Sequence, residues 1–98
     1  MQDSVVLKRK TKFMDDEVKK HGMCGKMLEY YLIQNSLNYG VKVIKKQGKD
    51  SFLYEEVFYA KNVGDYDKAN NVIELFARNK VTPIEANEVL EDLFKQFE

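Results

Sequence analysis

Apolar residues concentrate in three consecutive short segments in the middle of the chain: residues 27–34, 39–46 and 52–60. The segments are rich in Val, Ile, Tyr and Phe, and the short polar stretches between them, at 35–38 and 47–50, contain Asn, Gly and Asp. β-branched and aromatic runs bounded by such turn-forming residues are typical of strands joined by hairpins. The pattern therefore predicts an antiparallel β-meander over residues 26–62.

A further strand is predicted ahead of the meander, because side-chain character alternates over residues 5–13. One side carries Val5, Leu7, Thr11 and Phe13, and the other carries Lys8, Lys10 and Lys12, with Arg9 interrupting the apolar side. A lysine-lined strand suits the edge of a sheet, where charge discourages pairing with foreign chains; a disordered basic arm is the competing interpretation. Residues 15–20 indicate one helical turn, so we expect residues 1–25 to combine an edge strand with a flexible loop.

Two amphipathic helices are predicted over residues 65–97. Asp65 is a suitable N-cap for the first helix, whose apolar stripe contains Ala69, Val72, Ile73 and Phe76, widened by Leu75. The second helix has a strong start signal in Thr82-Pro83-Ile84-Glu85, with a capping hydroxyl, a proline at the first helical position and a glutamate three residues after the cap. Its apolar stripe contains Ala86, Val89, Leu90, Leu93, Phe94 and Phe97. We expect a helical hairpin that packs both stripes onto the sheet.

Together these elements predict a single α+β domain over residues 1–98, a three- or four-stranded antiparallel meander with a C-terminal two-helix hairpin packed on one face. The segments 27–34 and 52–60 carry apolar side chains on both faces, and two helices can cover only one face of a small sheet. The other face must be covered by the N-terminal segment, bent into the core through a bulge at Glu55 and Glu56, or buried against another chain. We expect the last of these, a homodimer, because a large apolar patch is seldom left exposed.

The charge balance limits the class of partner. The chain has 98 residues, of which 16 are basic and 16 acidic. This balance argues against a dedicated binder of nucleic acid or anionic membranes, since such proteins usually carry an excess of Lys and Arg. Residues 1–50 hold eleven basic and six acidic side chains, a net +5, and residues 51–98 hold five basic and ten acidic, a net −5. We expect the two halves to attract each other within the folded chain.

Cys24 is the only cysteine, so no intrachain disulfide can form and nothing indicates an oxidising compartment. The first residues lack the basic start and apolar core of a signal peptide, and no apolar run reaches membrane-spanning length. We therefore expect a cytoplasmic protein without membrane association. His21 and Cys24 form an H-x-x-C pair, but zinc sites need about three or four protein ligands. Because the chain has no second Cys or His, we expect no metal site.

No residue pattern in the chain indicates catalysis or a cofactor. The adjacent carboxylates Glu55 and Glu56 point to opposite faces of a strand, so they make no general acid–base pair, and Glu91 and Asp92 diverge around their helix. His21 and Cys24 lack the orienting third group that a nucleophilic pair needs. The five glycines are scattered and form no phosphate-binding loop. We expect a protein that is not an enzyme and binds no cofactor.

Aromatic and basic side chains of the central strands form a candidate partner surface: Tyr30, Tyr39, Tyr59, Lys42, Lys45 and Lys46. Tyrosines that stack on bases, beside lysines that neutralise phosphates, are suited to nucleic acid. Against this, the last helix carries Glu85, Glu88, Glu91 and Asp92, which phosphates would repel. The leading hypothesis is a small non-catalytic protein-interaction or regulatory module, homodimeric and with an unidentified protein partner. The alternative is a nucleic-acid-associated factor.

Three stretches carry a family resemblance: Glu29-Tyr30-Tyr31-Leu32, Tyr39-Gly40-Val41-Lys42-Val43, and residues 75–83 leading to Val89-Leu90-Glu91-Asp92. They resemble an uncharacterised family of small proteins from low-GC Gram-positive bacteria, over residues 27–94. The Tyr-Gly-Val and Asn-Lys-Val-Thr-Pro elements resemble the family's turn and helix-cap signatures, which are structural. The resemblance implies the α+β fold and a bacterial cytoplasmic protein, and it implies no activity.

Overall fold

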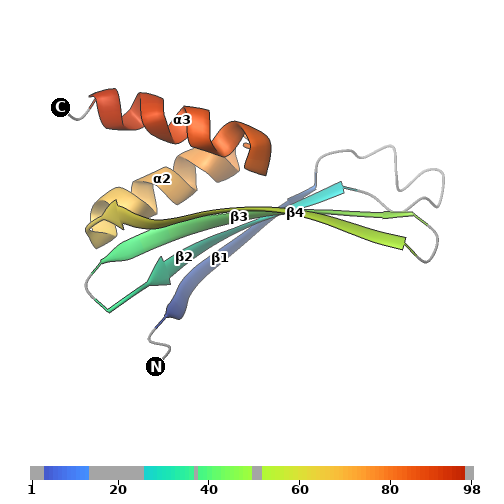
Figure 1. The fold of residues 1–98 in the computed structure, drawn as a ribbon, viewed down its shortest axis with the longest axis horizontal. Helices are drawn as coiled ribbons and strands as arrows, with labels where there is room; N and C mark the ends of the chain where they lie inside the picture. Colours follow the sequence, from blue (N-terminus) through green and yellow to red (C-terminus); the bar gives the residue numbers. More distant parts are fainter. Residues whose placement is uncertain (1–3, 14–25, 37, 50–51, 97–98) are drawn as a thin grey trace.

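The protein is a four-stranded antiparallel sheet followed by two helices that lie on one side of it (Figure 1). The computed structural model describes residues 4–13, 26–36, 38–49 and 52–96. The strands are β1 (Val5–Phe13), β2 (Lys26–Gln34), β3 (Tyr39–Lys49) and β4 (Phe52–Gly64), in the order β1-β2-β3-β4. The helices are α2 (Tyr66–Arg78) and α3 (Pro83–Gln96). The α+β meander with a C-terminal helical pair is therefore confirmed, with four strands.

The two hairpin turns of the meander differ from each other in how well the sequence predicted them. At the predicted turn over residues 35–38, the backbone N–H of Asn35 donates to the carbonyl of Asn38 at 2.8 Å. The turn predicted over residues 47–50 is wrong in extent, because β3 continues to Lys49 and pairs Gln47 with Tyr54 and Lys49 with Phe52. Backbone pairing continues past the last apolar side chain, since the ladder bonds do not depend on side-chain polarity.

The sheet contains two irregularities in register, neither of them where the sequence suggested. One lies between Val6 and Lys8 of β1, and the other between Tyr39 and Val41 of β3. Glu55 and Glu56 pair in unbroken register with Lys46 and Lys45. The proposed bulge at Glu55 and Glu56 is therefore absent, and β4 does not turn its second apolar face into the core there.

Both helices begin where the sequence predicted. The Asp65 carboxylate accepts a hydrogen bond from the backbone N–H of Lys68 at 2.9 Å and caps α2. At α3, the Glu85 carboxylate accepts from the backbone N–H of Thr82 at 3.0 Å and from its hydroxyl at 2.9 Å. The Glu85 N–H in turn lies 3.4 Å from the Thr82 hydroxyl oxygen, so the capping box is reciprocal.

The core fills the space between the helices and one face of the sheet. α2 lies over β2 and β3, and α3 lies over β4 and β3. The buried side chains come from β2, β3 and the predicted helix stripes: Leu28, Tyr30, Leu32, Val41, Val43, Ala69, Val72, Ile73, Phe76, Ala86 and Leu90. Tyr30 is fully buried, and its hydroxyl donates to the carbonyl of Val81 at 2.8 Å, tying the sheet to the loop between the helices.

The lysine side of β1 turns toward the helices. β1 is an edge strand, as predicted, and the alternative of a disordered arm is wrong for residues 5–13. The Lys8 and Lys10 ammonium groups lie 2.5 and 2.7 Å from the two carboxylate oxygens of Glu74 on α2. These ion pairs, with Lys45–Glu56 at 3.9 Å, join the basic first half of the chain to the acidic second half, as the charge pattern predicted.

Candidate functional site

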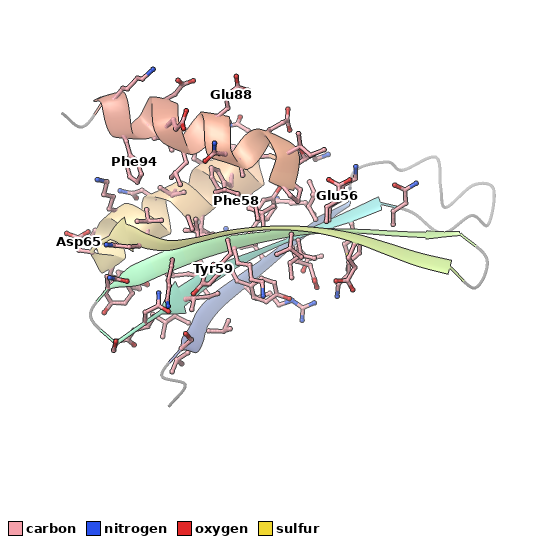
Figure 2. The ribbon with its side chains drawn as sticks, in the orientation of Figure 1. Glu56, Phe58, Tyr59, Asp65, Glu88 and Phe94 are labelled. Atoms are coloured by element: carbon pink, nitrogen blue, oxygen red, sulfur yellow. The ribbon has the colours of Figure 1, made fainter. Side chains whose placement is uncertain are left out.

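The face of the sheet away from the helices is the candidate site. In a strand, successive side chains alternate between the two faces; in Figure 2, Phe58 of β4 points toward the helices and its neighbour Tyr59 points away from them. Among the described residues, both helices lie on the Phe58 side. We call the other side the open face and define it by the strand residues Val6, Arg9, Thr11, Met27, Glu29, Tyr31, Ile33, Lys42, Ile44, Lys46, Glu55, Val57 and Tyr59.

One row of side chains crosses the open face from edge to edge and alternates cation with tyrosine. Arg9 pairs with Tyr31, Tyr31 with Lys42, and Lys42 with Tyr59, so each strand contributes one member. The Arg9 guanidinium lies 5.8 Å from the centre of the Tyr31 ring, and the Lys42 ammonium 5.9 Å from that of Tyr59. These distances are within the range of cation–π attraction. We call these four residues the cation–tyrosine row.

Beside this row, an ion cluster surrounds Glu29. The side chain of Glu29 is fully buried although it belongs to the open face, because its neighbours fold over it. Arg9 donates to one carboxylate oxygen, and the Lys46 ammonium lies 3.0 Å from the other. The carboxylate is therefore neutralised by two cations that come from β1 and β3, on either side of its own strand.

The cluster holds Glu29 ionised. Burial alone would raise the pKa of Glu29, but hydrogen bonds from Lys46, Arg9 and Tyr31 together outweigh burial and lower the pKa below its ordinary value. The same hydrogen bonds raise the pKa of Arg9 and Lys46. Burial, and next the Glu29 charge, raise the pKa of Tyr31, so its phenol stays protonated. These groups are held in fixed charge states and serve to orient the row.

A second network fixes the Tyr59 end of the row. The Tyr59 hydroxyl donates to the side-chain carbonyl of Asn35 at 3.2 Å, and the Ser4 hydroxyl donates to the same oxygen at 2.9 Å. The Asn35 amide in turn donates to the backbone carbonyl of Lys61 at 2.7 Å. The Tyr59 ring is thus held at its hydroxyl end while the rest of the side chain stays accessible, with 42% of its surface exposed.

Large apolar side chains remain exposed on the open face. Val57 is 53% exposed and Val6 is 55% exposed, at opposite edges of the sheet. Ile44, Tyr31 and Met27 between them are partly buried. The face therefore presents aliphatic and aromatic surface, and three of its charged residues, Arg9, Glu29 and Lys46, are paired with each other within the chain. Such a mixture is typical of a protein contact.

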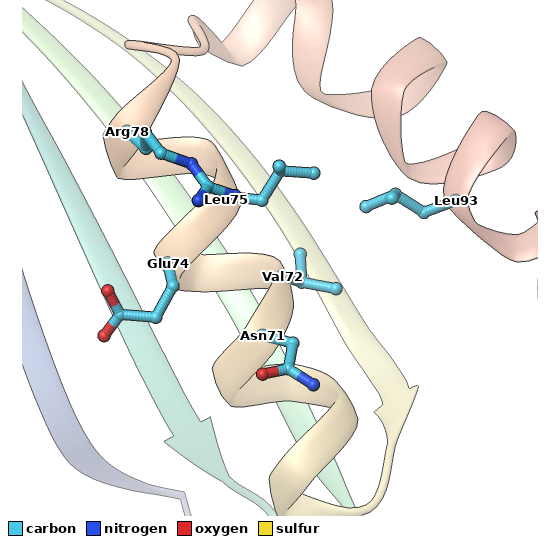
Figure 3. A pocket seen from close by; sticks show the side chains of 6 residues that line it. All are labelled: Asn71, Val72, Glu74, Leu75, Arg78 and Leu93. Carbon is cyan, nitrogen blue, oxygen red and sulfur yellow. The ribbon is translucent and has the colours of Figure 1, made fainter.

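A pocket lies between the two helices. Figure 3 shows Val72 and Leu75 of α2 facing Leu93 of α3 across a pocket of about 340 Å³. Glu74 is also part of its lining, but it is held by Lys8 and Lys10, and the hydrogen bond from Lys10 followed by that from Lys8 lowers the pKa of Glu74 to about 2. The described part of the chain contains no group of three His, Cys, Asp or Glu side chains able to hold a metal ion.

The chain matches one family over residues 6–96, which is most of its length. It belongs to DUF6514, a family of unknown function. No match was found among curated proteins or among solved structures. The match begins in β1, so the resemblance placed over residues 27–94 was too short. No helix within the described ranges has the length and apolar character needed to cross a membrane.

The six residues predicted to form one partner surface lie on both faces of the DUF6514 sheet. Lys42, Lys46 and Tyr59 belong to the open face. The other three lie on the helix side: Tyr30 is fully buried, Tyr39 packs edge-on against Tyr66 with ring centres 5.7 Å apart, and Lys45 lies 3.9 Å from Glu56. Placing all six on one face was wrong: Lys42 and Lys45 are three residues apart on β3 and so face opposite ways, and the register pairs Tyr59 with Lys42 but Tyr30 with Val43.

The predicted partner surface left out three residues of the cation–tyrosine row and the ion cluster in this DUF6514 chain: Arg9, Glu29 and Tyr31. Arg9 was seen only as an interruption of the apolar side of its strand. The available signal was the period-two alternation itself, which places Arg9 opposite the lysines of β1, and Glu29 and Tyr31 on one side of β2. These residues lie close together because of the β1–β2 register, and that register cannot be predicted from patterns among neighbouring residues of the chain. His21 and Cys24 lie outside the described residues.

Proposed function

We propose that this protein is a non-catalytic interaction module that works as a homodimer through its open face. The observation that carries the proposal is the exposure of aliphatic and tyrosine surface on the open face, at Val6, Val57 and Tyr59. Exposed apolar surface on both edge strands of one sheet face, with the partly buried Met27, Tyr31 and Ile44 between them, favours burial against protein. The resemblance to proteins of Gram-positive bacteria supports the bacterial cytoplasm as the setting of this module.

The size of the open face fits a modest interface. Four strands spaced about 4.8 Å apart, with about 3.3 Å per residue along the nine-residue strands β1 and β2, give a face of roughly 19 by 30 Å. Two copies would bury on the order of 1,100 Å², just above the roughly 1,000 Å² that a specific interface needs. We therefore expect a dimer that dissociates on dilution.

Charge states support a role without catalysis. The clustered carboxylates Glu29 and Glu74 each contact two cations and have lowered pKa values. A general acid or base must exchange its proton near the working pH, and these groups stay ionised there. Their geometry supports positioning of neighbouring side chains instead of proton transfer.

Sedimentation equilibrium from low to high micromolar concentration tests the homodimer. We expect the wild-type chain to dimerise over this range and Val57→Glu to remain monomeric, because a carboxylate replaces exposed apolar surface at the interface. Ile84→Glu is the matched control, since Ile84 is 77% exposed on α3, away from the open face. Circular dichroism verifies that both variants fold. A wild-type chain that is monomeric at high micromolar concentration would overturn the proposal.

Nucleic-acid binding is the second candidate, favoured by the two cations and two tyrosines of the cation–tyrosine row. The geometry supports it less well, because Arg9 and Lys46 are already paired with Glu29. A titration of single- and double-stranded nucleic acid at low salt separates the two functions, since phosphate contacts are strongest there. Retention at low salt that disappears in Lys42→Glu would favour this candidate; no retention at low salt would exclude it.

A further inference from the structure

We infer that two copies of the chain pack open face against open face, about a two-fold axis that runs parallel to the strands between β2 and β3. The inference rests on the proposed homodimer and adds the orientation of the second copy. It comes from the order of side chains in the cation–tyrosine row, which reads Arg9, Tyr31, Lys42, Tyr59 from β1 to β4.

An axis in this position places β1 over β4 of the second copy, and β2 over its β3. Arg9 then faces Tyr59 of the second copy, and Lys42 faces Tyr31 of the second copy. Every cation in the row meets an aromatic ring, an attraction that strengthens when water is excluded from the contact. The row is thus complementary to itself when its direction is reversed.

The other face-to-face symmetry lacks this complementarity. A two-fold axis that runs along the row, across the strands, places each strand over its own mate. Arg9 would then face Arg9, and Lys42 would face Lys42. Like charges directly opposed at an interface are unfavourable and act against such an arrangement.

The neighbouring rows of the open face agree with the parallel axis. In the next row, Thr11 faces Val57 of the second copy, and Glu29, already paired within its own chain, faces Ile44. One row further, Met27 faces Lys46. Among these described positions, no two like charges are opposed, and polar groups are matched with groups that need no hydrogen-bond partner.

Cross-linking between exposed edge positions reads out the orientation. Face-to-face sheets lie about 10 Å apart, so opposed side chains are within reach of a short bifunctional maleimide. In the inferred dimer, Thr11 lies opposite Val57 of the second copy, whereas the two Thr11 residues are offset by three strand spacings, about 14 Å. Both side chains are exposed in the single chain.

The experiment uses two single-cysteine proteins, Thr11→Cys and Val57→Cys, each in a Cys24→Ser background. We expect the mixture to give the mixed cross-linked dimer in at least fivefold excess over either self-linked dimer. Mostly self-linked dimers would overturn the inferred orientation and leave the homodimer standing. A chain that sediments as a monomer would instead overturn the homodimer on which the inference rests.

A charge reversal tests the same inference without cross-linking. Lys42→Glu places a carboxylate against the Tyr31 ring of the second copy at two symmetric positions, and we expect roughly tenfold weaker dimerisation. Lys12→Glu is the control, because Lys12 is an exposed lysine of β1 that does not belong to the open face. A Lys42→Glu chain that pairs preferentially with wild type, Glu against Lys, would indicate the axis along the row and overturn the inference.

Discussion

At the scale of single residues, the polar groups of Glu29, Glu74 and Tyr30 are held by specific partners from other elements of the chain. Glu29 lies under Arg9 and Lys46, and Glu74 between Lys8 and Lys10. The chemical type of each residue could be read from the sequence, but its partner could not. Two measurements test how much these contacts contribute to stability.

The first concerns the pH dependence of stability. The folded-state pKa of Glu74 is about 2 against an ordinary value of 4.5, so its charged form stabilises the folded chain. This contribution is fully present above pH 4.5 and is lost as the pH falls through 2. We expect Glu74→Gln to flatten the decline in unfolding free energy over this window, measured by urea unfolding at a series of pH values.

The control for this measurement is Glu88→Gln, since Glu88 points away from the sheet on the outer side of α3 (Figure 2). The Glu74 side chain is 40% exposed, so added salt should reduce the difference between wild type and Glu74→Gln. An unchanged pH profile in Glu74→Gln at low salt would show that the Lys8 and Lys10 pairs do not act in solution.

The second measurement concerns the buried hydroxyl of Tyr30. Tyr30→Phe removes the donor to the Val81 carbonyl and leaves that acceptor without this partner. We expect a loss of about 1–3 kcal/mol in unfolding free energy, measured by urea denaturation. Tyr66→Phe keeps the ring contact with Tyr39 at an exposed site and should change stability by less than about 0.5 kcal/mol. Equal effects of the two substitutions would contradict this assignment.

At the scale of elements, helices were easier to predict than strands. Helix caps act over three or four residues, so Asp65 and the Thr82–Glu85 box gave both helix starts. Strand ends depend on the neighbouring strand, so β3 and β4 run beyond their predicted ends. The position of a register irregularity also depends on the neighbouring strand. In β3 it lies next to Gly40, whereas Glu55 and Glu56 of β4 pair regularly with Lys46 and Lys45.

Gly40 offers a test at this scale. A Cβ added there would lie 2.5 Å from the Ala60 carbonyl oxygen and 2.6 Å from that of Lys61, so the β3–β4 backbone must shift to accommodate it. We expect Gly40→Ala to lower the unfolding free energy by about 1–3 kcal/mol, although glycine-to-alanine changes at unstrained sites are stabilising. Ser36→Ala, in the adjacent turn, is the control in thermal and urea unfolding. A stabilised Gly40→Ala would contradict the close approach of the two strands.

At the scale of the whole molecule, the question is what covers the open face. The sequence indicated apolar side chains on both sides of the central strands, and the structure places both helices on one side. On the open face, Val6, Val57 and Tyr59 of the described strands therefore remain exposed. A second copy of the chain is the proposed cover.

Dimerisation makes thermal stability depend on concentration. Only folded chains can dimerise, so dimerisation stabilises the folded state by mass action. The Tm of wild type should therefore rise between low and high micromolar protein concentration. Lys42→Glu should show a weaker rise, and the Tm of Lys12→Glu should follow that of wild type. Differential scanning fluorimetry across a dilution series measures this, and a wild-type Tm that does not change with concentration would count against the homodimer.

The sequence by itself determined most elements of this protein: the three strands of the meander, two capped helices and their apolar stripes, because turn, cap and periodicity signals act between residues close in the chain. The fourth strand, over residues 5–13, was predicted beside the alternative of a disordered arm. Tertiary structure alone decided which face the helices cover, which lysines pair with Glu74, and that Arg9, Tyr31, Lys42 and Tyr59 stand in one row. These relations follow from strand register, and a shift of one residue would move every side chain of a strand to the other face. Register is fixed by the packing of the whole core, so the candidate site became visible only in the folded chain.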